Sequence, residues 1–386
     1  MESGQLRKLN LCYAGIQSLY WAGFAAIWAF LSVLLLYRGF SNSQIGTVSA
    51  LALLMPLAVQ PVLASLADRD RRFTSRRLAM ALTGLLLLCA VGLWCSAGSM
   101  VVTAALYVLV GINAERDEQG AMELQQHGVA LNYGLSRGLG SACYAASVLV
   151  LGVVVERYAP TAVLPVFAGE MLLLLLLTWR FRASPTAAAA AGSGPVLSVG
   201  QLLRCYPAYT WLLVGCALLM ACHSATCTYM IHIVGKVGGS ESMMGSALAV
   251  AAFLELPAMG LFSRVRRKVP LAWLLIFCAV FFVIRAGLFW AARSVPVLYL
   301  AAALDFFEYG IFIPATVYYV AEHIDPANQV KGQSLMGMAT TGVGSAFGNF
   351  VSGQLLDRAG VNGMLLFCSA CAAVGLLVVI YAVRKK

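Results

Sequence analysis

The sequence predicts an all-α integral membrane protein with twelve transmembrane helices in two pseudo-symmetric six-helix bundles. Its 386 residues are 61% hydrophobic and 11% charged, whereas a soluble domain is about 45–50% apolar and about 25% charged. A spanning helix needs about 20 mostly apolar residues, and apolar runs of that length recur from Leu11 to Val383. The bilayer therefore surrounds the body of this protein, and the runs are not a single anchor.

Turn residues divide these runs into two sets of six, joined by a segment of different composition. The first set is predicted near residues 11–37, 44–67, 78–97, 100–119, 131–155 and 161–181, and the second near 208–234, 243–263, 270–291, 296–321, 333–356 and 362–383. Between them lie Pro185, an alanine run and Gly192–Pro195, a composition typical of a flexible linker. We therefore expect bundles at 1–181 and 208–386, with a cytoplasmic linker at 182–207.

The placement of Lys and Arg predicts the orientation, because cytoplasmic loops retain positive charge. Of the 26 Lys and Arg, 19 fall on the side that holds both termini and five on the other side. The remaining two, Arg137 and Arg285, lie within predicted spans and are counted on neither side. We therefore expect a multi-pass protein of the plasma membrane with both termini in the cytoplasm, and the net charge of +10 needs no nucleic-acid partner.

An internal repeat supports the two bundles. Pro61 precedes a basic loop by seven residues in the first half, and Pro257 does so at the equivalent place in the second. Spans 5 and 11 both end with an acidic residue followed by arginine, at Glu156 and Asp357. Duplicated halves predict a substrate site at the repeat interface, near the middle of the membrane.

The loop after span 2 resembles the signature G-x-L-A-D-R-x-G-R-R of the major facilitator superfamily. The signature falls on Ala64, Leu66, Ala67, Asp68, Arg69, Arg71 and Arg72, where Ala64 and Arg71 replace its two glycines. The resemblance implies that Asp68, Arg69 and Arg72 make contacts that form and break as the two halves rock. Alternatively the arginines are anchors of the positive side, which leaves Asp68 unexplained.

Both halves resemble lactose permease and the related oligosaccharide:proton symporters. The residues in register are Gln60, Pro61, Asp68, Gly134, Arg137, Gly140, Tyr144, Arg285, Glu308, Gly353, Asp357, Gly360 and Gly363. The resemblance implies that Glu308 carries a proton, that Arg285 takes part in coupling, and that Arg137 and Tyr144 bind substrate. This sequence departs from the family in two places. The family has a histidine where Asp305 stands, and it has a charged pair between spans 7 and 11 that this sequence lacks. These departures argue against lactose as substrate.

The carboxylates of span 10 are candidates for proton binding on physical grounds as well. Asp305 and Glu308 lie about 14 and 18 Å into the span at 1.5 Å per residue, and residues three apart share one helical face. Two carboxylates in a low-dielectric cavity repel, which favours proton uptake, while Arg285 offsets one charge. We expect Glu308 to carry the proton, Arg285 to reset it and Asp305 to tune it. Two alternatives are a static buried ion pair and an Arg285 side chain that reaches the membrane surface.

Span 5 offers a candidate substrate site. Arg137 and Tyr144 are seven residues apart, so both project from the same helical face. A guanidinium beside an aromatic ring suits a polyhydroxylated ligand, through bidentate hydrogen bonds and ring stacking. In the alternative interpretation Arg137 reaches the cytoplasmic surface and Tyr144 faces lipid.

The polar end of span 4 has two open interpretations. Glu115 and Glu118 lie near the register position from which the family pairs a carboxylate with the span 5 arginine, and Gln119 occupies that position itself. Either acid then reaches Arg137 and contributes to the substrate site. Alternatively the cluster is a solvated helix end.

Other polar residues in the spans are weaker candidates. Span 7 offers His223, Thr226, Thr228, Tyr229 and His232 as polar cavity lining, although packing explains each of them singly. Glu255 in span 8 is out of register with the family's glutamate. Cys368 and Cys371 lie within the last span without a partner pair, so we expect no metal site.

These observations predict a secondary active transporter that works by alternating access. We expect proton-coupled symport of a small polar solute, namely a sugar, an oligosaccharide or a nucleoside. The alternative is proton-coupled efflux of an amphipathic compound. We find no enzyme motif, and we expect a monomer in the lipid bilayer that uses the proton gradient and no cofactor.

Overall fold

The computed structural model describes residues 3–69, 75–95, 99–126, 133–180 and 197–385, and every regular element in these ranges is a helix. Side chains are described throughout these ranges except at residues 3–9, 60–61, 63–69, 75–76, 114–126 and 133–137. The predicted all-α class is confirmed.

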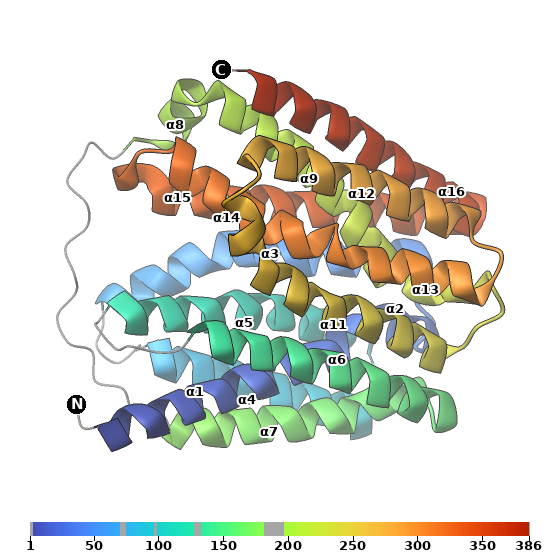
Figure 1. The fold of residues 1–386 in the computed structure, drawn as a ribbon. Helices are drawn as coiled ribbons and strands as arrows, with labels where there is room; N and C mark the ends of the chain where they lie inside the picture. Colours follow the sequence, from blue (N-terminus) through green and yellow to red (C-terminus); the bar gives the residue numbers. More distant parts are fainter. Residues whose placement is uncertain (1–2, 70–74, 96–98, 127–132, 181–196, 386) are drawn as a thin grey trace. The chain divides into compact units, whose positions relative to one another are not determined.

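The helices follow the predicted spans closely (Figure 1). In the first half they are α1 Ser3–Phe24, η1 Ala25–Ala29, α2 Leu31–Tyr37, α3 Asn42–Arg69, α4 Ser75–Cys95, α5 Met100–Gln126, α6 Tyr133–Arg157, η2 Pro160–Ala162 and α7 Val163–Arg180. In the second half they are α8 Val199–Cys205, α9 Pro207–Thr228, α10 Met230–Gly235, α11 Glu241–Arg266, α12 Leu271–Ala291, α13 Val295–Ala303, η3 Leu304–Phe306, α14 Tyr309–His323, η4 Pro326–Asn328, α15 Gln329–Gly337, η5 Met338–Gly344 and α16 Ser345–Arg384.

Nine helices in the described ranges are long and apolar enough to cross a membrane, or ten if the bent pair Asn10–Ala29 and Leu31–Tyr37 is one span. One of the nine, Pro326–Arg384, covers two predicted spans, and its helix α16 breaks at Gly360, where φ is +67°. Where the structure describes them, all twelve predicted spans lie mainly on helix, but length and apolarity alone do not establish twelve. The number of spans stays a prediction.

Large apolar side chains are exposed on the outer faces of these helices. Leu88 of α4 is 70% exposed and Leu377 of α16 is 65% exposed. In water such faces drive association, whereas lipid tails solvate them, and a helix satisfies its own backbone hydrogen bonds in that medium. The exposed apolar faces therefore agree with a membrane environment.

The chain forms two compact units whose boundaries cross two helices. Unit 1 comprises Met1–Phe40, Leu51–Ala190 and Glu241–Ala249, and unit 2 comprises Ser41–Ala50, Ala191–Ser240 and Val250–Lys386. The first residues of α3 thus pack with unit 2, and the first residues of α11 pack with unit 1. The predicted boundaries at 181 and 208 did not anticipate these two segments.

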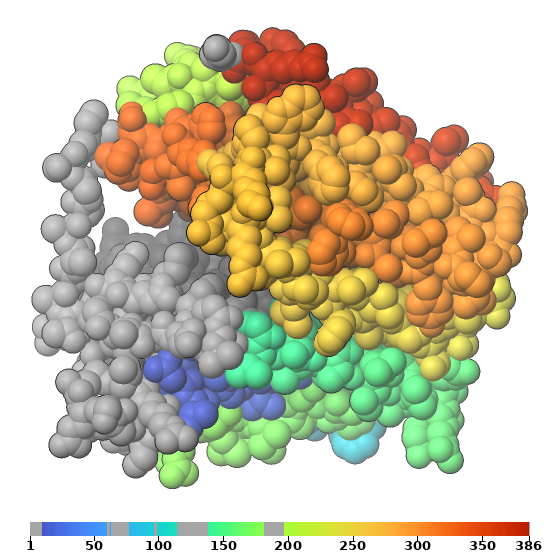
Figure 2. Space-filling view, viewed as in Figure 1, coloured from blue at the N-terminus to red at the C-terminus, as the bar shows by residue number. Residues whose placement is uncertain are grey.

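Each unit has its own helix contacts. In unit 1, α1 packs on α6 and α7, and α4 packs on α5 and α7. In unit 2, α9 packs on α16 and η5, and α12 packs on α14 and α16. Segments far apart in the sequence, from α8 in light green to α16 in red, therefore make up the surface of unit 2 (Figure 2).

Glycine permits the closest of these contacts. A Cβ atom on Gly348 of α16 would lie 2.1 Å from the carbonyl oxygen of Ala221 in α9, and one on Gly344 would lie 2.4 Å from that of Ala217. The two backbones therefore touch, as is typical of membrane helices with small residues at their interface. This contact places α9 against the rest of unit 2 and fixes the position of His223 on it.

Candidate functional site

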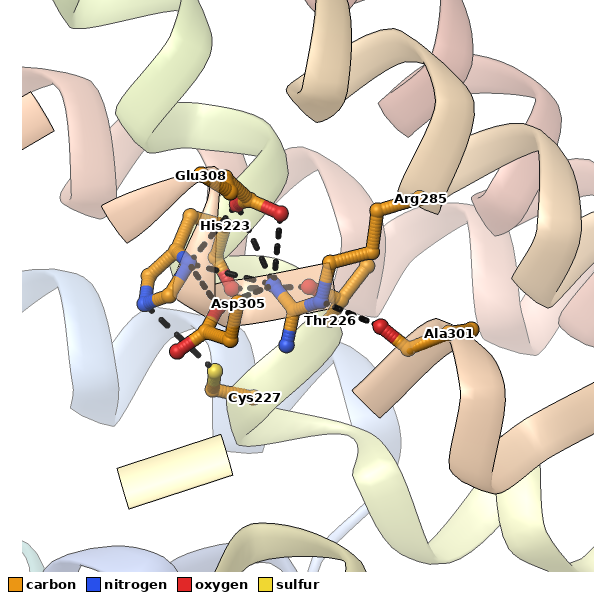
Figure 3. Close-up of polar contacts among 7 residues, drawn as sticks. All are labelled: His223, Thr226, Cys227, Arg285, Ala301, Asp305 and Glu308. Atoms are coloured by element: carbon orange, nitrogen blue, oxygen red, sulfur yellow. Dashed lines mark hydrogen bonds and ion pairs between the residues drawn. The ribbon is translucent and has the colours of Figure 1, made fainter. Parts of the chain in front are cut away.

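A charged cluster lies inside unit 2, built from α12, α9 and the interrupted helix of span 10 (Figure 3). Arg285 on α12 is 2% exposed, and Asp305 and Glu308 are each 1% exposed. These are the three residues that the sequence predicted to act together in span 10 and its neighbour. The structure brings them into one cluster, and their role in proton coupling stays a prediction.

Span 10 is not a continuous helix where the carboxylates lie. It changes to a 3-10 turn at Leu304–Phe306, and Glu308 has φ −86° and ψ −93°, outside the helical region. A 3-10 turn places residues three apart in line, so Asp305 and Glu308 still point the same way. The interruption was not predicted, and in a membrane protein such interruptions occur where the chain lines a cavity or binds an ion.

One nitrogen of Arg285 joins both carboxylates. Its Nη1 lies 3.0 Å from Asp305 Oδ1 and 3.1 Å from each oxygen of Glu308. The Nε–H donates to the carbonyl of Ala301 at 3.2 Å, and the guanidinium lies over the Phe289 ring, 5.2 Å from its centroid. These contacts hold Arg285 inside the unit, so the alternative in which it reaches the membrane surface is wrong.

His223 of α9 is a fourth member of the cluster. Its Nδ1 lies 3.0 Å from Glu308 Oε1, 3.2 Å from Arg285 Nη1 and 3.7 Å from Asp305 Oδ1. The sequence suggested His223 only as cavity lining. A histidine within a span is an ionisable group in a costly place, and this signal could have assigned it to the charged set.

Glu255 of α11 adds a third carboxyl to the cluster. It lies near Asp305, because a Cβ atom on Gly310 would be 3.5 Å from both the Glu255 Cα atom and the Asp305 carbonyl oxygen. From the sequence Glu255 is a weaker candidate, because it is out of register with the family's glutamate. The position of Glu255 along α11 does not by itself show which residues of the neighbouring helices it meets.

The arrangement of these groups favours a guanidinium over a metal ion. One ligand atom from each of His223, Asp305 and Glu308 lies within 4.8 Å of the others, a spacing that would suit a metal. Arg285 Nη1 lies between 3.0 and 3.2 Å from all three side chains, so a cation already occupies the position among them.

The predicted substrate residues are only partly described. Tyr144 is a half-buried residue of α6. The side chains of Arg137, Glu115 and Glu118 lie outside the described ones, although their backbones are helical in α6 and α5. Whether Arg137 meets Tyr144 or an acid of span 4 therefore stays a prediction.

The predicted gating residues fall at the edge of the described chain. Asp68 and Arg69 end α3, and their side chains lie outside the described ones. Arg72 lies outside the described residues altogether.

Comparison with known proteins decides the family. The model of the MFS_1 like family matches residues 10–369. The chain belongs to this family. The predicted membership of the major facilitator superfamily is thereby confirmed, and the protein is a multi-pass membrane transporter of small molecules and not an enzyme.

Relatives of the family differ in the transport that their names describe. Maltose permease of Geobacillus stearothermophilus is 26% identical over 370 residues, which cover 94% of this chain and 92% of the relative. A putative sugar efflux transporter of Deinococcus radiodurans is 22% identical over 180 residues, or 46% of each chain. The crystal structure of nucleoside transporter NupG matches with a TM-score of 0.79 at 15% identity, covering 98% of this chain and 99% of that one, and so shares the fold.

Proposed function

We propose that this transporter couples the uptake of a small polar solute to the entry of protons, and that Glu308 carries the proton. The observation that carries the proposal is the buried cluster in which one Arg285 nitrogen faces two carboxylates. Maltose permease, similar along nearly the whole chain, supports a sugar or an oligosaccharide as the solute. A nucleoside is the next candidate.

Charge balance explains how such a cluster couples a proton to a change of conformation. Arg285 faces the carboxylates of Asp305 and Glu308, and its single positive charge neutralises Asp305. Glu308 then decides the net charge, which is zero with a proton bound and negative without one. Because an uncompensated charge costs several kcal/mol away from water, the protonated cluster favours the closed, dehydrated state. The deprotonated cluster favours a state in which water reaches it.

The remaining roles follow from the sequence. Arg137 and Tyr144 bind the solute through hydrogen bonds and ring stacking, with Glu115 or Glu118 orienting the guanidinium. Asp68, Arg69 and Arg72 open and close contacts at the cytoplasmic end. The protein works as a monomer in the plasma membrane with both termini in the cytoplasm, and the proton gradient is its energy source.

Uptake into proteoliposomes tests the proposed function. Purified protein is given an imposed pH gradient, acidic outside, and a panel of radiolabelled maltose, maltotriose and uridine. We expect accumulation of at least one panel member that collapses when a protonophore is added. Accumulation that ignores the pH gradient for every transported solute would contradict proton coupling.

Efflux is the second candidate, and the half-chain similarity to the putative sugar efflux transporter favours it. Inside-out vesicles with an acidic interior distinguish the two directions, because an antiporter accumulates its compound there while protons leave. We expect no accumulation of the panel solutes in these vesicles.

A further inference from the structure

Glu308 has almost no access to water of its own. Its side chain is 1% exposed, and those of Arg285 and Asp305 are 2% exposed. The side chain of His223 is 12% exposed, the largest fraction among these four groups. A proton that reaches Glu308 therefore has to pass through another group.

The His223 ring is placed to transfer a proton. Nδ1 lies 3.0 Å from Glu308 Oε1, and Nε2 on the far side of the ring lies 3.7 Å from Cys227 Sγ. The ring stacks on Tyr309, with ring centroids 4.5 Å apart and 9° between the planes. It meets Phe282 edge to face, with ring centroids 6.3 Å apart. These two aromatic contacts keep Nδ1 directed at the carboxylate.

We propose that His223 relays the proton between cavity water and Glu308, an inference that rests on the proposed role of Glu308. In the inward step Nε2 takes a proton from a hydronium ion in the cavity, which leaves as water, while the Nδ1–H bond breaks and its proton forms an Oε1–H bond on Glu308. The imidazole changes tautomer and stays neutral, and both ring nitrogens can donate or accept. The reverse step returns the proton from Glu308 to Nδ1 and releases one from Nε2, which resets the ring.

Other groups in the cluster do not offer a separate route. Arg285 does not release a proton in proteins. Glu255 reaches Asp305, but from Asp305 the nearest groups toward Glu308 are Arg285 Nη1 at 3.0 Å and His223 Nδ1 at 3.7 Å. The titratable and charged groups that face His223 are Glu308, Asp305, Arg285, Cys227, the stacked Tyr309 and, behind Asp305, Glu255.

Time-resolved infrared spectroscopy after a light-triggered pH drop measures the relay without a substrate. The C=O band of a protonated carboxylic acid reports the arrival of the proton, and its loss in Glu308→Gln assigns the band. We expect His223→Ala to lower the rate at which the band appears by about 10²-fold, which is the low end of the contribution of a positioned acid–base group. The final amplitude of the band should not change. Added imidazole should restore the rate in proportion to its concentration, because it fills the space of the missing ring.

Two further variants keep the test decisive. His223→Gln fills the site but cannot pass a proton through, so it should be slow and should not respond to imidazole; it carries the test alone if the alanine variant does not fold. His232→Ala, which removes the other histidine of span 7, should keep the wild-type rate. A wild-type rate in His223→Gln would overturn the relay. A band that persists in Glu308→Gln would instead overturn the proposed role of Glu308.

Discussion

Asp357, at the end of predicted span 11, caps the start of α3 through Ser43. Its Oδ2 accepts the Ser43 backbone N–H at 2.8 Å and the Ser43 hydroxyl at 2.6 Å, while Oδ1 accepts from Asn42. Both residues belong to unit 2. A carboxylate at a helix N-terminus satisfies free N–H groups and faces the positive end of the helix dipole.

The same relationship occurs in unit 1. Glu156, at the end of α6, accepts the backbone N–H of Ser242 at 3.1 Å, in the first turn of α11. The acidic residues that the repeat places at equivalent span ends thus serve as equivalent caps. They hold the two helix starts that pack outside the predicted bundle boundaries.

Loss of the Asp357 cap is expected to destabilise unit 2. Asp357→Asn keeps one acceptor oxygen but loses the second one and the charge, which should cost about 1 kcal/mol, the net value of one hydrogen bond, because solvent screens this exposed site. Arg358→Gln is the control, because it removes a charge next to Asp357 but leaves the cap in place. Thermal unfolding in detergent checks both variants, and equal melting temperatures for Asp357→Asn and the wild type would contradict the cap.

The Asp357 cap also predicts a pH dependence. Burial opposes ionisation, but hydrogen bonds from Ser43 and Asn42 outweigh it and lower the pKa of Asp357 to about 2. A lowered carboxyl pKa gives stabilisation that is complete above the ordinary value and is lost as pH falls through the lowered one. The difference in melting temperature between wild type and Asp357→Asn should therefore stay constant at neutral pH and shrink as pH falls from the ordinary carboxyl pKa of 3.8 through about 2.

The contact between α9 and α16 should tolerate no added methyl group. Gly348→Ala places its Cβ 2.1 Å from a backbone oxygen, so the helices must separate, at a cost of about 1–3 kcal/mol. Gly287→Ala on α12 is the matched control, because a Cβ there meets no atom within 4 Å. Thermal unfolding should show a loss for Gly348→Ala and none for Gly287→Ala; equal melting temperatures would contradict the packing.

Arg285 and Glu308 should show strong energetic coupling. Arg285→Gln leaves buried carboxylates without a cation and should destabilise by about 3–5 kcal/mol. Adding Glu308→Gln removes one of those carboxylates, so the double variant should recover part of the loss. A double-mutant cycle on unfolding free energies measures this, and additive effects would show that the two side chains do not interact.

A lysine in place of Arg137 should weaken solute binding. Lys keeps the charge but loses the planar pair of donors, so affinity for the transported solute should fall by at least about tenfold, near the loss of one good hydrogen bond to a charged group. Tyr144→Phe keeps the ring and should bind with near wild-type affinity. Equilibrium binding of the radiolabelled solute checks both, and wild-type affinity in Arg137→Lys would exclude a bidentate role.

The sequence predicted the helices because they follow from the local pattern of apolar and turn residues. It predicted the three central charged residues because a charge within the membrane costs free energy unless it has a partner. Apolar runs and turn residues indicate helices, and a charge such as Arg285 within a span requires a partner. The interruption at Glu308 lies where Arg285 contacts Ala301 and both carboxylates across the bundle, and local pattern does not reveal such contacts. His223 and Glu255 also come from other helices, so only tertiary packing shows that they join the cluster. The segments 41–50 and 241–249 pack with the unit opposite to the one their sequence position predicts. The sequence does not reveal this, because their partners Asp357 and Glu156 are distant along the chain.

The central claim is that Glu308 carries the coupled proton, and transport by Glu308→Gln in proteoliposomes tests it most directly. The solute that the wild type accumulates fastest is measured in two modes, exchange without a gradient and accumulation driven by a pH gradient. We predict that Glu308→Gln exchanges the solute at a rate close to the wild type but does not accumulate it, because the amide mimics the protonated acid and releases no proton. Gradient-driven accumulation at the wild-type level in Glu308→Gln would contradict the account.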